Sequence, residues 1–462
     1  MNTPLASSPR YAHRLWPALG LVLLLHACAV LPLSGPGSLP AARPVSGPFR
    51  VHALPGGLDD VPVFNSNSPE LIHEAGITLS SLPPAGSDDA GVFLDHAFEG
   101  RFSVFSHHLA DVFVGSTQVL HLVLVAHNHT DRTVTLRQQR GASRVTRPEA
   151  PFKALESLLD DPTGTIYAGP GDRVATEFLH GLTSQDSRTV GPNTSALLAT
   201  WAISPDVTAG RNERSTLLHL ESDGPVYLTE VAVLAPPNQV PDLGMVQAAI
   251  NAKRLAGPRD SAPTAYDPAQ PPTGGAFRYG RVGGISQGDR WTGTLFGPSG
   301  PALPAPGERV GFPIASVVLN HLGTGQIQSA PMRKRYPDTA YQAHGNYGVT
   351  YNLTIPLDNP DDAPRSFTLG LSSPLKLQEG ATLSFAPPEG RRIHFRGQVR
   401  LEWQDEKGVT QTRFRHLVLH DGEDLAPFET ITVPGRSRLE PRLTLIYPAD
   451  CTPPQMLMVG RI

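Results

Sequence analysis

QVLHLVLVAHNHTDRTVTL, residues 118–136, is the clearest strand–turn–strand unit in the chain. Leucine and β-branched residues fill its first half, Asn-His-Thr-Asp makes a turn, and threonine, valine and leucine form the return strand, which is typical of a β-hairpin. The unit recurs, because LVLVAHN at 122–128 is matched by LTIPLDN at 353–359, and the return strands TVTL and SFTL also correspond. Two copies of one hairpin predict two β domains.

The composition favours the same fold class. Among 462 residues there are 47 prolines and 44 glycines, which suit short strands and many turns better than long helices. A chain of this length divides into two or three domains, each large enough for its own core. The formal net charge is only -4, from 38 basic and 42 acidic residues, so no overall field attracts nucleic acid or acidic lipid. Any binding through charge must be local, and we predict no nucleic-acid partner.

The N-terminal residues 1–29 have the composition of a secretory signal. Basic residues precede an apolar run at 15–25, which is shorter than the ~20 residues of a membrane-spanning helix. Cys28 stands where a bacterial lipobox has its lipidated cysteine, whereas Ala27 and Ala29 equally form a cleavage site that releases a soluble protein. We therefore predict export, with the mature protein either free in the periplasm or held at a membrane as a lipoprotein through Cys28.

The rest of the chain divides by composition. Residues 30–47 form a tether rich in proline, glycine and serine, and residues 257–275 form a similar linker without an apolar period. These boundaries predict an N-terminal domain at 48–256 and a C-terminal domain at 276–462. The predicted fold is mainly β, with two antiparallel β-sandwich domains, Ig-like or jelly-roll-like. One short helix, at 242–255, is expected before the linker.

Three further local patterns predict a helix, a strand and a functional loop. Ser68 and Pro69 begin a short helix pattern that ends at Gly76, since serine caps helices and proline suits the first helical position. Residues 173–179, RVATEFL, are predicted to form a strand after a Gly-Pro-Gly-Asp turn. Residues 323–347 form a long polar and aromatic loop, and loops of this length inside compact domains are often functional.

Four motifs carry a resemblance to a known family. They are FNSNSPE at 64–70, TIYAGPGDR at 165–173, AGPRD at 256–260, and GTGQIQSAPM followed by RYPDTAYQAHGNYG within 323–348. Together they resemble an uncharacterised cyanobacterial family of exported proteins that is known only as a domain of unknown function. The resemblance covers nearly the whole chain after the signal. It implies a cyanobacterial, extracytoplasmic origin, and it brings no activity or catalytic residue with it.

Catalytic motifs are almost absent from the sequence. GISQG at 284–288 fits the G-x-S-x-G pattern of a nucleophile elbow, whose serine needs a strand-to-helix turn. Residues 289–296 have a strand pattern instead, so a hairpin turn is the better interpretation. No Walker loop, H-E-x-x-H motif or cysteine-based zinc pattern occurs. We predict neither catalytic residues nor a cofactor.

Histidines gather near the first hairpin. His127 and His129 flank the turn asparagine and, as residues i and i+2 of an extended segment, point the same way. They form a candidate transition-metal site, with His107 or Asp95 as a third ligand. The alternative is that they are turn histidines in solvent, because two ligands without a defined third seldom make a site.

A second candidate site combines basic and aromatic residues. In the strand predicted at 391–403 polar and apolar residues alternate, so that arginines line one face, and the return strand adds two more. Arginine binds carboxylate and phosphate groups through paired hydrogen bonds, and tyrosine stacks on rings. A solvated outer face is the alternative interpretation. The candidate residues for binding an anionic polymer are Arg392, Arg396, Arg400, Arg413 and Arg415 in the strands and Arg333, Lys334, Arg335, Tyr336 and Tyr341 in the loop.

These patterns leave the function unknown. The interpretation that we favour is a non-enzymatic, extracytoplasmic cell-envelope protein that binds an anionic polymer or a protein partner, with membrane contact only through a lipid anchor. A glycan-active or other hydrolytic enzyme is an alternative, but the 323–347 loop offers only Asp338 where glycoside hydrolysis normally needs two carboxylates. A purely structural spacer is the third interpretation.

Overall fold

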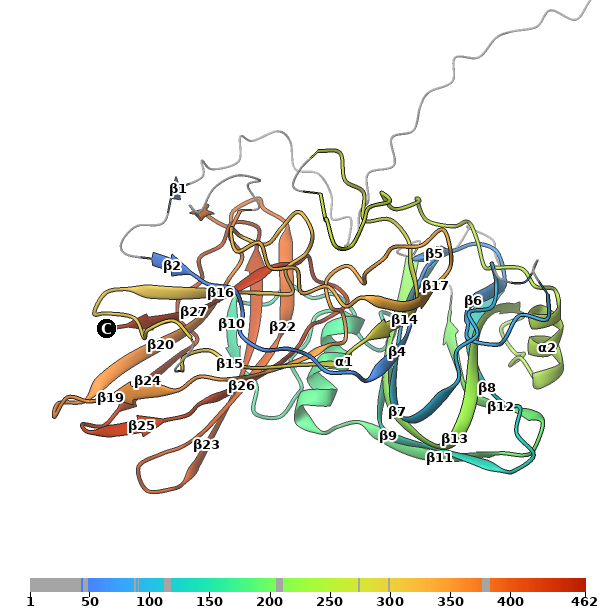
Figure 1. Cartoon of the computed structure of the whole chain (residues 1–462), viewed down its shortest axis with the longest axis horizontal. Helices are drawn as coiled ribbons and strands as arrows, with labels where there is room; N and C mark the ends of the chain where they lie inside the picture. Colours follow the sequence, from blue (N-terminus) through green and yellow to red (C-terminus); the bar gives the residue numbers. More distant parts are fainter. Residues whose placement is uncertain are drawn as a thin grey trace, which may run out of the picture. The chain divides into compact units, whose positions relative to one another are not determined.

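Mainly antiparallel sheets, packed in pairs, form the framework of the chain (Figure 1). The computed structural model describes residues 43–44, 49–86, 89, 91–111, 118–204, 211–272, 275–297, 300–375 and 383–462. Within these ranges the fold is mainly β with sandwich-like packing, as predicted, and it contains two helices. None of the helices described is both long and apolar enough to cross a membrane. The signal segment, with Cys28, lies outside the described residues.

The first sandwich is organised by strand β13 (Arg211–Ala235), which is 25 residues long. Its other strands are β4 (Pro62–Asn67), β5 (Leu71–Ile72), β6 (Gly76–Ser80), β7 (Phe98–Asp111), β8 (Val119–Asn128), β9 (Val134–Val145), β11 (Ser184–Val190) and β12 (Thr194–Ile203). Residues 211–222 of β13 pair with β7 and β9 in one layer, while residues 227–235 pair with β8 in the other. Buried side chains such as Phe64, Leu124 and Leu218 fill the space between the layers.

The second sandwich also has two layers. Its strands are β2 (Phe49–Val51), β3 (Gly57–Leu58), β10 (Leu158–Asp160), β15 (Arg290–Thr294), β16 (Arg309–Ile314), β18 (Thr350–Thr354), β19 (Leu357–Asn359), β20 (Arg365–Ser372), β22 (Ile393–Gln404), β23 (Thr410–His420), β24 (Glu429–Val433), β25 (Ser437–Leu439), β26 (Arg442–Ile446) and β27 (Gln455–Arg461). One sheet has the order β10-β23-β22-β26-β18-β15-β3 and the other β2-β16-β27-β20-β24. Phe312, Tyr351 and Leu457 lie in the core between them, as does the buried thiol of Cys451. A separate short pair joins β1 (Arg43–Pro44) to β21 (Ser384–Phe385). Four strand pairs within the described residues, β15-β18, β16-β2, β4-β7 and β5-β7, are parallel.

The two sandwiches exchange strands. β14 (Val282–Gln287) and β17 (Met332–Arg335) follow the 257–275 linker in the sequence, yet β14 pairs with β4 and β17 pairs with β14. Conversely, β3 and β10 precede the linker and pair with β15 and β23. Each sandwich therefore contains residues from both sides of the linker.

This exchange corrects the interpretation of GISQG at 284–288 as a hairpin turn. β14 pairs with β4 and β17, and β15 pairs with β3 and β18, so the turn after Ser286 carries the chain from one sandwich to the other. Ser286 is 2% exposed inside β14. A strand follows it and not a helix, so a nucleophile elbow is absent at this position.

The repeat predicted from the sequence is confirmed down to its hydrogen bonds, but the hairpin is wrong. β8 pairs with β12 and β13, and β9 pairs with β11 and β13, so the turn carries the chain from one layer to the other. Asn128 is fully buried at the end of β8. Its side-chain amide donates to the carbonyl oxygen four residues on, Arg132, at 2.6 Å, and to two carbonyls at the end of β11, Val190 and Gly191, at 3.0 Å each. Its oxygen accepts the backbone N–H of Thr130 at 2.9 Å. One side chain thus joins the turn to the neighbouring strand.

Asn359 repeats this arrangement in the second sandwich. It is 1% exposed, and its amide donates to Ala363, again four residues on, at 2.9 Å. It also donates to two carbonyls at the end of β24, Val433 and Pro434, at 3.0 and 2.9 Å. Its oxygen accepts the N–H of Asp361 at 3.1 Å. The correspondence therefore extends beyond the strand pattern to every partner of the asparagine.

The turns that face these asparagines correspond as well. Asn193 and Arg436 both have a left-handed φ, 51° and 52°, which is unusual for residues other than glycine. Each donates its N–H to the opposite turn, at 3.0 Å to Thr130 and 2.8 Å to Asp361. β8 pairs with β12 and β19 pairs with β25 in the same sense. The chain therefore contains two copies of one four-strand corner.

The helix predicted at 242–255 is confirmed as α2 (Leu243–Asn251), capped by Asp242, and it packs on β13 and β6. The strand predicted at 173–179 is wrong, because this segment lies in helix α1 (Pro170–His180). Its apolar residues, Val174, Ala175, Phe178 and Leu179, have helical spacing and are all buried against β9, β13 and β26. The Gly-Pro-Gly-Asp sequence that indicated a turn is the start of this helix, with proline at its first position.

The short helix predicted from Ser68 to Gly76 is also wrong. β5 and the start of β6 occupy this segment. Asp260, from the linker, accepts the Ser68 hydroxyl at 2.7 Å and the N–H of Glu70 at 3.2 and 3.0 Å. The groups that would cap a helix are therefore bonded to a distant residue, and tertiary contacts override the local pattern.

Candidate functional site

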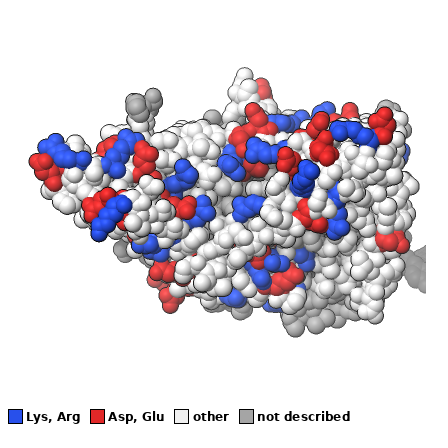
Figure 2. All heavy atoms as spheres, turned by 90° about the horizontal axis from the view of Figure 1, so that it is seen from below, with Lys and Arg blue, Asp and Glu red and all other residues white. Residues whose placement is uncertain are grey.

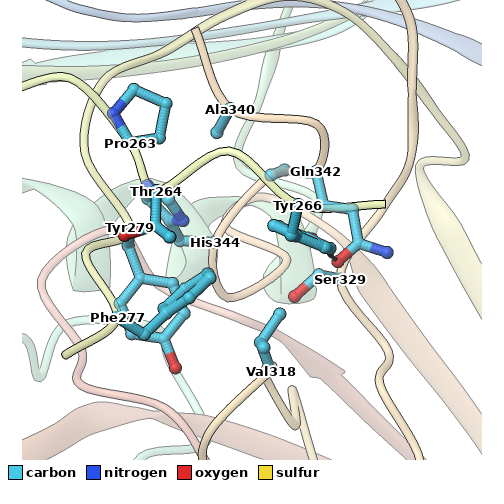
Figure 3. A pocket seen from close by; sticks show the side chains of 11 residues that line it. Pro263, Thr264, Tyr266, Phe277, Tyr279, Val318, Ser329, Ala340, Gln342 and His344 are labelled. Carbon is cyan, nitrogen blue, oxygen red and sulfur yellow. Dashed lines mark hydrogen bonds between the residues drawn. The ribbon is translucent and has the colours of Figure 1, made fainter. Parts of the chain in front are cut away.

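An aromatic hollow lies where the linker meets the long loop (Figure 3). The empty space in the hollow, together with the solvent at its mouth, is about 270 Å³, whereas the part that a water molecule can occupy is about 10 Å³, room for about one water. A ligand ring can therefore lie across the mouth of the hollow, against its rim. The lining residues of the hollow are Pro263, Thr264, Tyr266, Phe277, Tyr279, Val318, Ser329, Ala340, Gln342, Ala343 and His344.

The rings of the hollow pack against one another nearly edge to face. The ring centroids of Tyr266 and Phe277 are 5.6 Å apart, those of Phe277 and Tyr279 are 4.9 Å apart, and those of Tyr279 and His344 are 5.0 Å apart. Tyr341 lies behind Tyr266 at 5.5 Å. Such pairs contribute about 0.5 to 1.5 kcal/mol each beyond the burial of their area. The aromatic wall is therefore stabilised before any ligand arrives.

Hydrogen bonds fix the polar tips of these rings. The Tyr266 hydroxyl donates to Gln342 Oε1 at 2.9 Å, as the dashed line in Figure 3 marks. The Tyr279 hydroxyl accepts a backbone N–H at 3.2 Å. His344 Nε2 is 2.6 Å from the carbonyl oxygen of Gly280, so this nitrogen carries the proton and donates. Each of these three rings has a hydrogen-bond partner at its polar end, so little side-chain entropy is left to lose on binding.

Gly280 allows the linker to close over this wall. Its φ is +68°, and a Cβ there would lie 2.4 Å from the nitrogen of Pro263. Only glycine accepts both conditions. The Pro263 segment is therefore held directly against the aromatic residues that follow the linker.

The lining of the hollow is uncharged. Its lining residues, all of them described, include no Asp, Glu, Lys or Arg. Burial lowers the pKa of His344 to about 4, so the imidazole is neutral at pH 7. Burial raises the pKa of Tyr266 and of Tyr279, so their hydroxyls stay protonated. The hollow thus offers aromatic faces and neutral hydrogen-bonding groups, and no nucleophile beside a base.

The loop residues predicted to bind an anion have other contacts. Tyr336 is 1% exposed, and its hydroxyl donates to Val92 O at 2.9 Å. One Arg335 nitrogen donates to three backbone carbonyls, and the guanidinium lies 3.9 Å from the centroid of Tyr341. Arg333 donates to Asp60 O at 2.7 Å, whereas Lys334 is exposed. Tyr336 is a core residue and is not accessible for stacking on a ligand.

The structure divides the predicted arginine row between two faces. Residues directly opposite each other in antiparallel strands share a face. Arg413 lies opposite Leu401, and Arg415 lies opposite Val399, so both are on the face of these core residues and not on the face of Arg396. The expected gathering of five arginines on one patch is therefore not formed, because the register of β22 and β23 places them on opposite sides.

The face with the remaining arginines is covered in part. Arg396 is 7% exposed and lies 5.2 Å from the ring centroid of Phe152. The neighbouring Gln398 accepts a hydrogen bond from His180 of α1 at 2.9 Å. Arg400 pairs with Glu402 at 2.9 Å, while Arg392 is exposed. Helix α1 and the segment before it thus lie over the middle of this face.

Surface charge shows the same mixing of signs. In Figure 2 basic and acidic side chains are interspersed over the face shown, without a broad area of one sign. Arg415, for example, pairs with both Glu429 at 2.8 Å and Asp160 at 2.5 Å. β17, which carries the loop arginines, belongs to the first sandwich, whereas β22 and β23 belong to the second. The two groups of basic residues are not parts of one strand pair.

The candidate metal ligands His107, on β7, and His127, on β8, lie opposite different parts of β13. His107 is opposite Ser215 and His127 is opposite Tyr227, and these partners are far apart along a strand that rises about 3.3 Å per residue. His127 is hydrogen-bonded at both ring nitrogens, and burial lowers its pKa to about 4 and that of His107 to about 3. In the part of the chain that the structure describes, no group of three or more His, Cys, Asp or Glu is placed to hold a metal.

The structure also brings together two carboxylates that the sequence analysis did not single out. Asp59 lies between β3 and β4 and Asp289 between β14 and β15, where the chain crosses between the sandwiches. Asp59 accepts the N–H of Asp289 at 3.0 Å, and Ser103 donates to the Asp289 carboxylate at 2.5 Å. Burial, and then the charge of Asp289, raises the pKa of Asp59. Two distant segments supply this pair, so sequence spacing does not reveal it.

Sequence reasoning likewise missed the aromatic hollow as a unit. It selected the 323–347 loop as functional, and it treated 257–275 as a linker only. The available signal was the presence of Tyr266, Phe277 and Tyr279 in a stretch otherwise rich in proline and glycine. Aromatic residues in such a stretch need a packing partner, and the loop supplies it through His344 and Tyr341.

These features define a class of mainly β proteins with two strand-exchanged sandwiches and an uncharged aromatic hollow between linker and loop. Within it, the chain belongs to the family described as Protein of unknown function (DUF3370), whose model matches residues 49–461. The match includes both corners and every residue of the hollow. No curated protein matches the sequence.

Proposed function

We propose that the protein is a non-enzymatic, extracytoplasmic component of the cell envelope that binds a polymer of the envelope at the aromatic hollow. The observation that carries this proposal is the set of four packed rings, fixed by hydrogen bonds, around the hollow. A polymer presents many equivalent rings, so a shallow site for one ring is useful through repeated encounters.

Binding is favoured over hydrolysis by the placement of carboxylates. Glycosidases hold two carboxyl groups about 5 to 9.5 Å apart, with sugar or water between them. Asp59 and Asp289 are close enough to hydrogen-bond with each other, so no reacting group fits between them. Asp338, beside the hollow, pairs with Arg259 at 3.0 Å and also with Arg281. Neither arrangement supplies an acid and a base across a hollow.

Export and anchoring are supported by the N-terminal sequence. The segment at 1–29 has a basic start, an apolar run and Cys28 in a lipobox-like context. The resemblance to a cyanobacterial exported family supports the same location. Labelling with palmitate in a bacterial host should mark the protein and should fail in Cys28→Ser. Equal labelling of both forms would contradict the lipid anchor.

The binding proposal is tested with immobilised protein and solubilised envelope fractions. Wild type should retain a polymer that Tyr266→Ala retains much less. Tyr227→Ala is the matched control, since Tyr227 is a partly buried tyrosine on β13 outside the hollow and contacts only His129 among aromatic rings. Circular dichroism and melting of each variant establish that it is folded. Equal retention by wild type and Tyr266→Ala would contradict binding at the hollow.

A further inference from the structure

We infer that the group bound in the aromatic hollow is a neutral sugar ring, so that the polymer is an uncharged glycan. This inference rests on the proposed function and names the ligand of the same site. It replaces the anionic polymer expected from the arginine row. Three features of the hollow support it, namely its charge, its remaining polar atoms and its own proline.

The charge around the hollow does not suit an ion. No charged side chain lines it, and His344 is neutral at pH 7. Two cations of the neighbouring segments are engaged by the protein. Arg281 donates to Asp260 O at 2.7 Å and pairs with Asp338. Arg335 donates to three carbonyls. An anion placed in the hollow would lose its hydration without gaining a counter-ion, which is strongly unfavourable.

The polar atoms left in the hollow suit hydroxyl groups. The oxygen of Gln342 is occupied by Tyr266, which leaves its Nε2 hydrogens as donors. No described protein group bonds the Ser329 hydroxyl, which can both donate and accept. The Thr264 hydroxyl accepts the N–H of Arg278 at 2.9 Å and keeps its own hydrogen as a donor. A sugar ring offers C–H groups to the aromatic faces and hydroxyls to these neutral donors and acceptors at its edge.

A proline-rich peptide is the rival occupant, because aromatic grooves also bind prolines. The chain's own Pro263 already lines the hollow, and its backbone lies close to that of Gly280. One side of the hollow is therefore already formed by a proline of the chain. The rest of the hollow carries the amide of Gln342 and the hydroxyl of Ser329. A proline ring has no group that can form hydrogen bonds with them.

The test is calorimetric titration of the full chain with defined oligomers. The neutral probes are hexasaccharides of glucose, mannose, galactose and N-acetylglucosamine, the anionic probe is a hexamer of galacturonate, and the peptide probe is hexaproline. At least one neutral hexasaccharide should bind. Its affinity should change little between about 0.05 and about 0.5 M salt, because no charge is involved.

Two substitutions locate the binding. Gln342→Ala and Tyr266→Ala should each lower the affinity for the neutral hexasaccharide about tenfold, which is the loss expected for one ring contact or hydrogen bond. Tyr227→Ala should leave the affinity unchanged. Binding of galacturonate or hexaproline alone, or of none of the probes, would overturn the inference. If envelope retention still depends on Tyr266 in that case, the hollow remains the binding site and only the neutral sugar is refuted.

Discussion

The amide of Asn128 provides the most direct test of the repeated corner. Replacing it by alanine removes hydrogen bonds to Arg132, Val190 and Gly191, and it removes the acceptor for Thr130. The side chain is fully buried. Three carbonyls that now share the amide hydrogens would be left without this donor. The turn and the end of β11 should therefore separate.

The size of the effect follows from the number of bonds. The amide has two hydrogens, so its three acceptors represent about two full hydrogen bonds, and the oxygen accepts from the Thr130 N–H and from the Thr130 hydroxyl at 2.6 Å. At about 0.5 to 1.5 kcal/mol for each bond, Asn128→Ala should cost about 2 to 6 kcal/mol in the free energy of unfolding. Asn359→Ala removes one accepted bond fewer and should cost about 1.5 to 4.5 kcal/mol.

Urea unfolding followed by circular dichroism measures both losses. The matched control is Asn251→Ala at the end of α2, where the exposed side chain accepts one bond from Gln247 at 3.0 Å. It should cost less than about 0.5 kcal/mol, as is usual for surface changes. A loss below about 1 kcal/mol for both buried asparagines, similar to that of the control, would refute the view that these amides hold the corners.

Three further predictions concern charge and chain connectivity. Burial and the charge of Asp289 raise the pKa of Asp59, so the ionised form of Asp59 is disfavoured in the folded state. Asp59→Asn should therefore raise the melting temperature at pH 7 more than at pH 3.5. A lower melting temperature of the variant at pH 7 would contradict this. Burial lowers the pKa of His416, but Asp172 at 2.8 Å outweighs it and the net pKa is raised. The stabilisation from this pair is therefore complete below pH 6.5 and is lost as the pH rises through the raised pKa. His416→Gln should remove that part of the pH dependence of the melting temperature. An unchanged pH dependence in the variant would argue against the ion pair. Limited proteolysis should cut the 257–275 linker and leave two resistant fragments. The fragments should elute together in gel filtration, because β14 pairs with β4 and β3 pairs with β15. Separate elution of the fragments would contradict the strand exchange.

Local repetition is what made much of the fold predictable. The strand, the turn asparagine and the return strand are contiguous, so 122–128 and 353–359 reveal both corners without any knowledge of distant contacts. Helix α2 was predictable for the same reason, since its cap and apolar spacing lie within one short segment. Helix α1 was not, because its apolar residues fit both a strand and a helix until their burial decides between them.

The exposure of side chains is the property that could least be predicted from the sequence. Alternation in β22 correctly separates polar from apolar residues, but it cannot say what covers the polar face. In the folded protein Phe152 and helix α1 lie over that face, so Arg396 and Gln398 are buried although they alternate like solvent-exposed residues. The register with β23 is also a tertiary property, and it moves Arg413 to the other side.

The position of the hollow relative to the two corners explains why it escaped detection and why it is suited to carry function. β13, which pairs with β8 and β9 of the first corner, ends at Ala235, and the second copy begins with β18 at Thr350. Every residue that lines the hollow falls between these limits. The repeated corners supply rigid sheets, and the non-repeated chain between them supplies the aromatic residues, held in place by Gly280 and by hydrogen bonds to loop backbone. A site of this kind has no periodic sequence pattern, so it cannot be found from periodicity. Its residues can vary without disturbing the strands beneath, which is the usual relation between a binding loop and its scaffold.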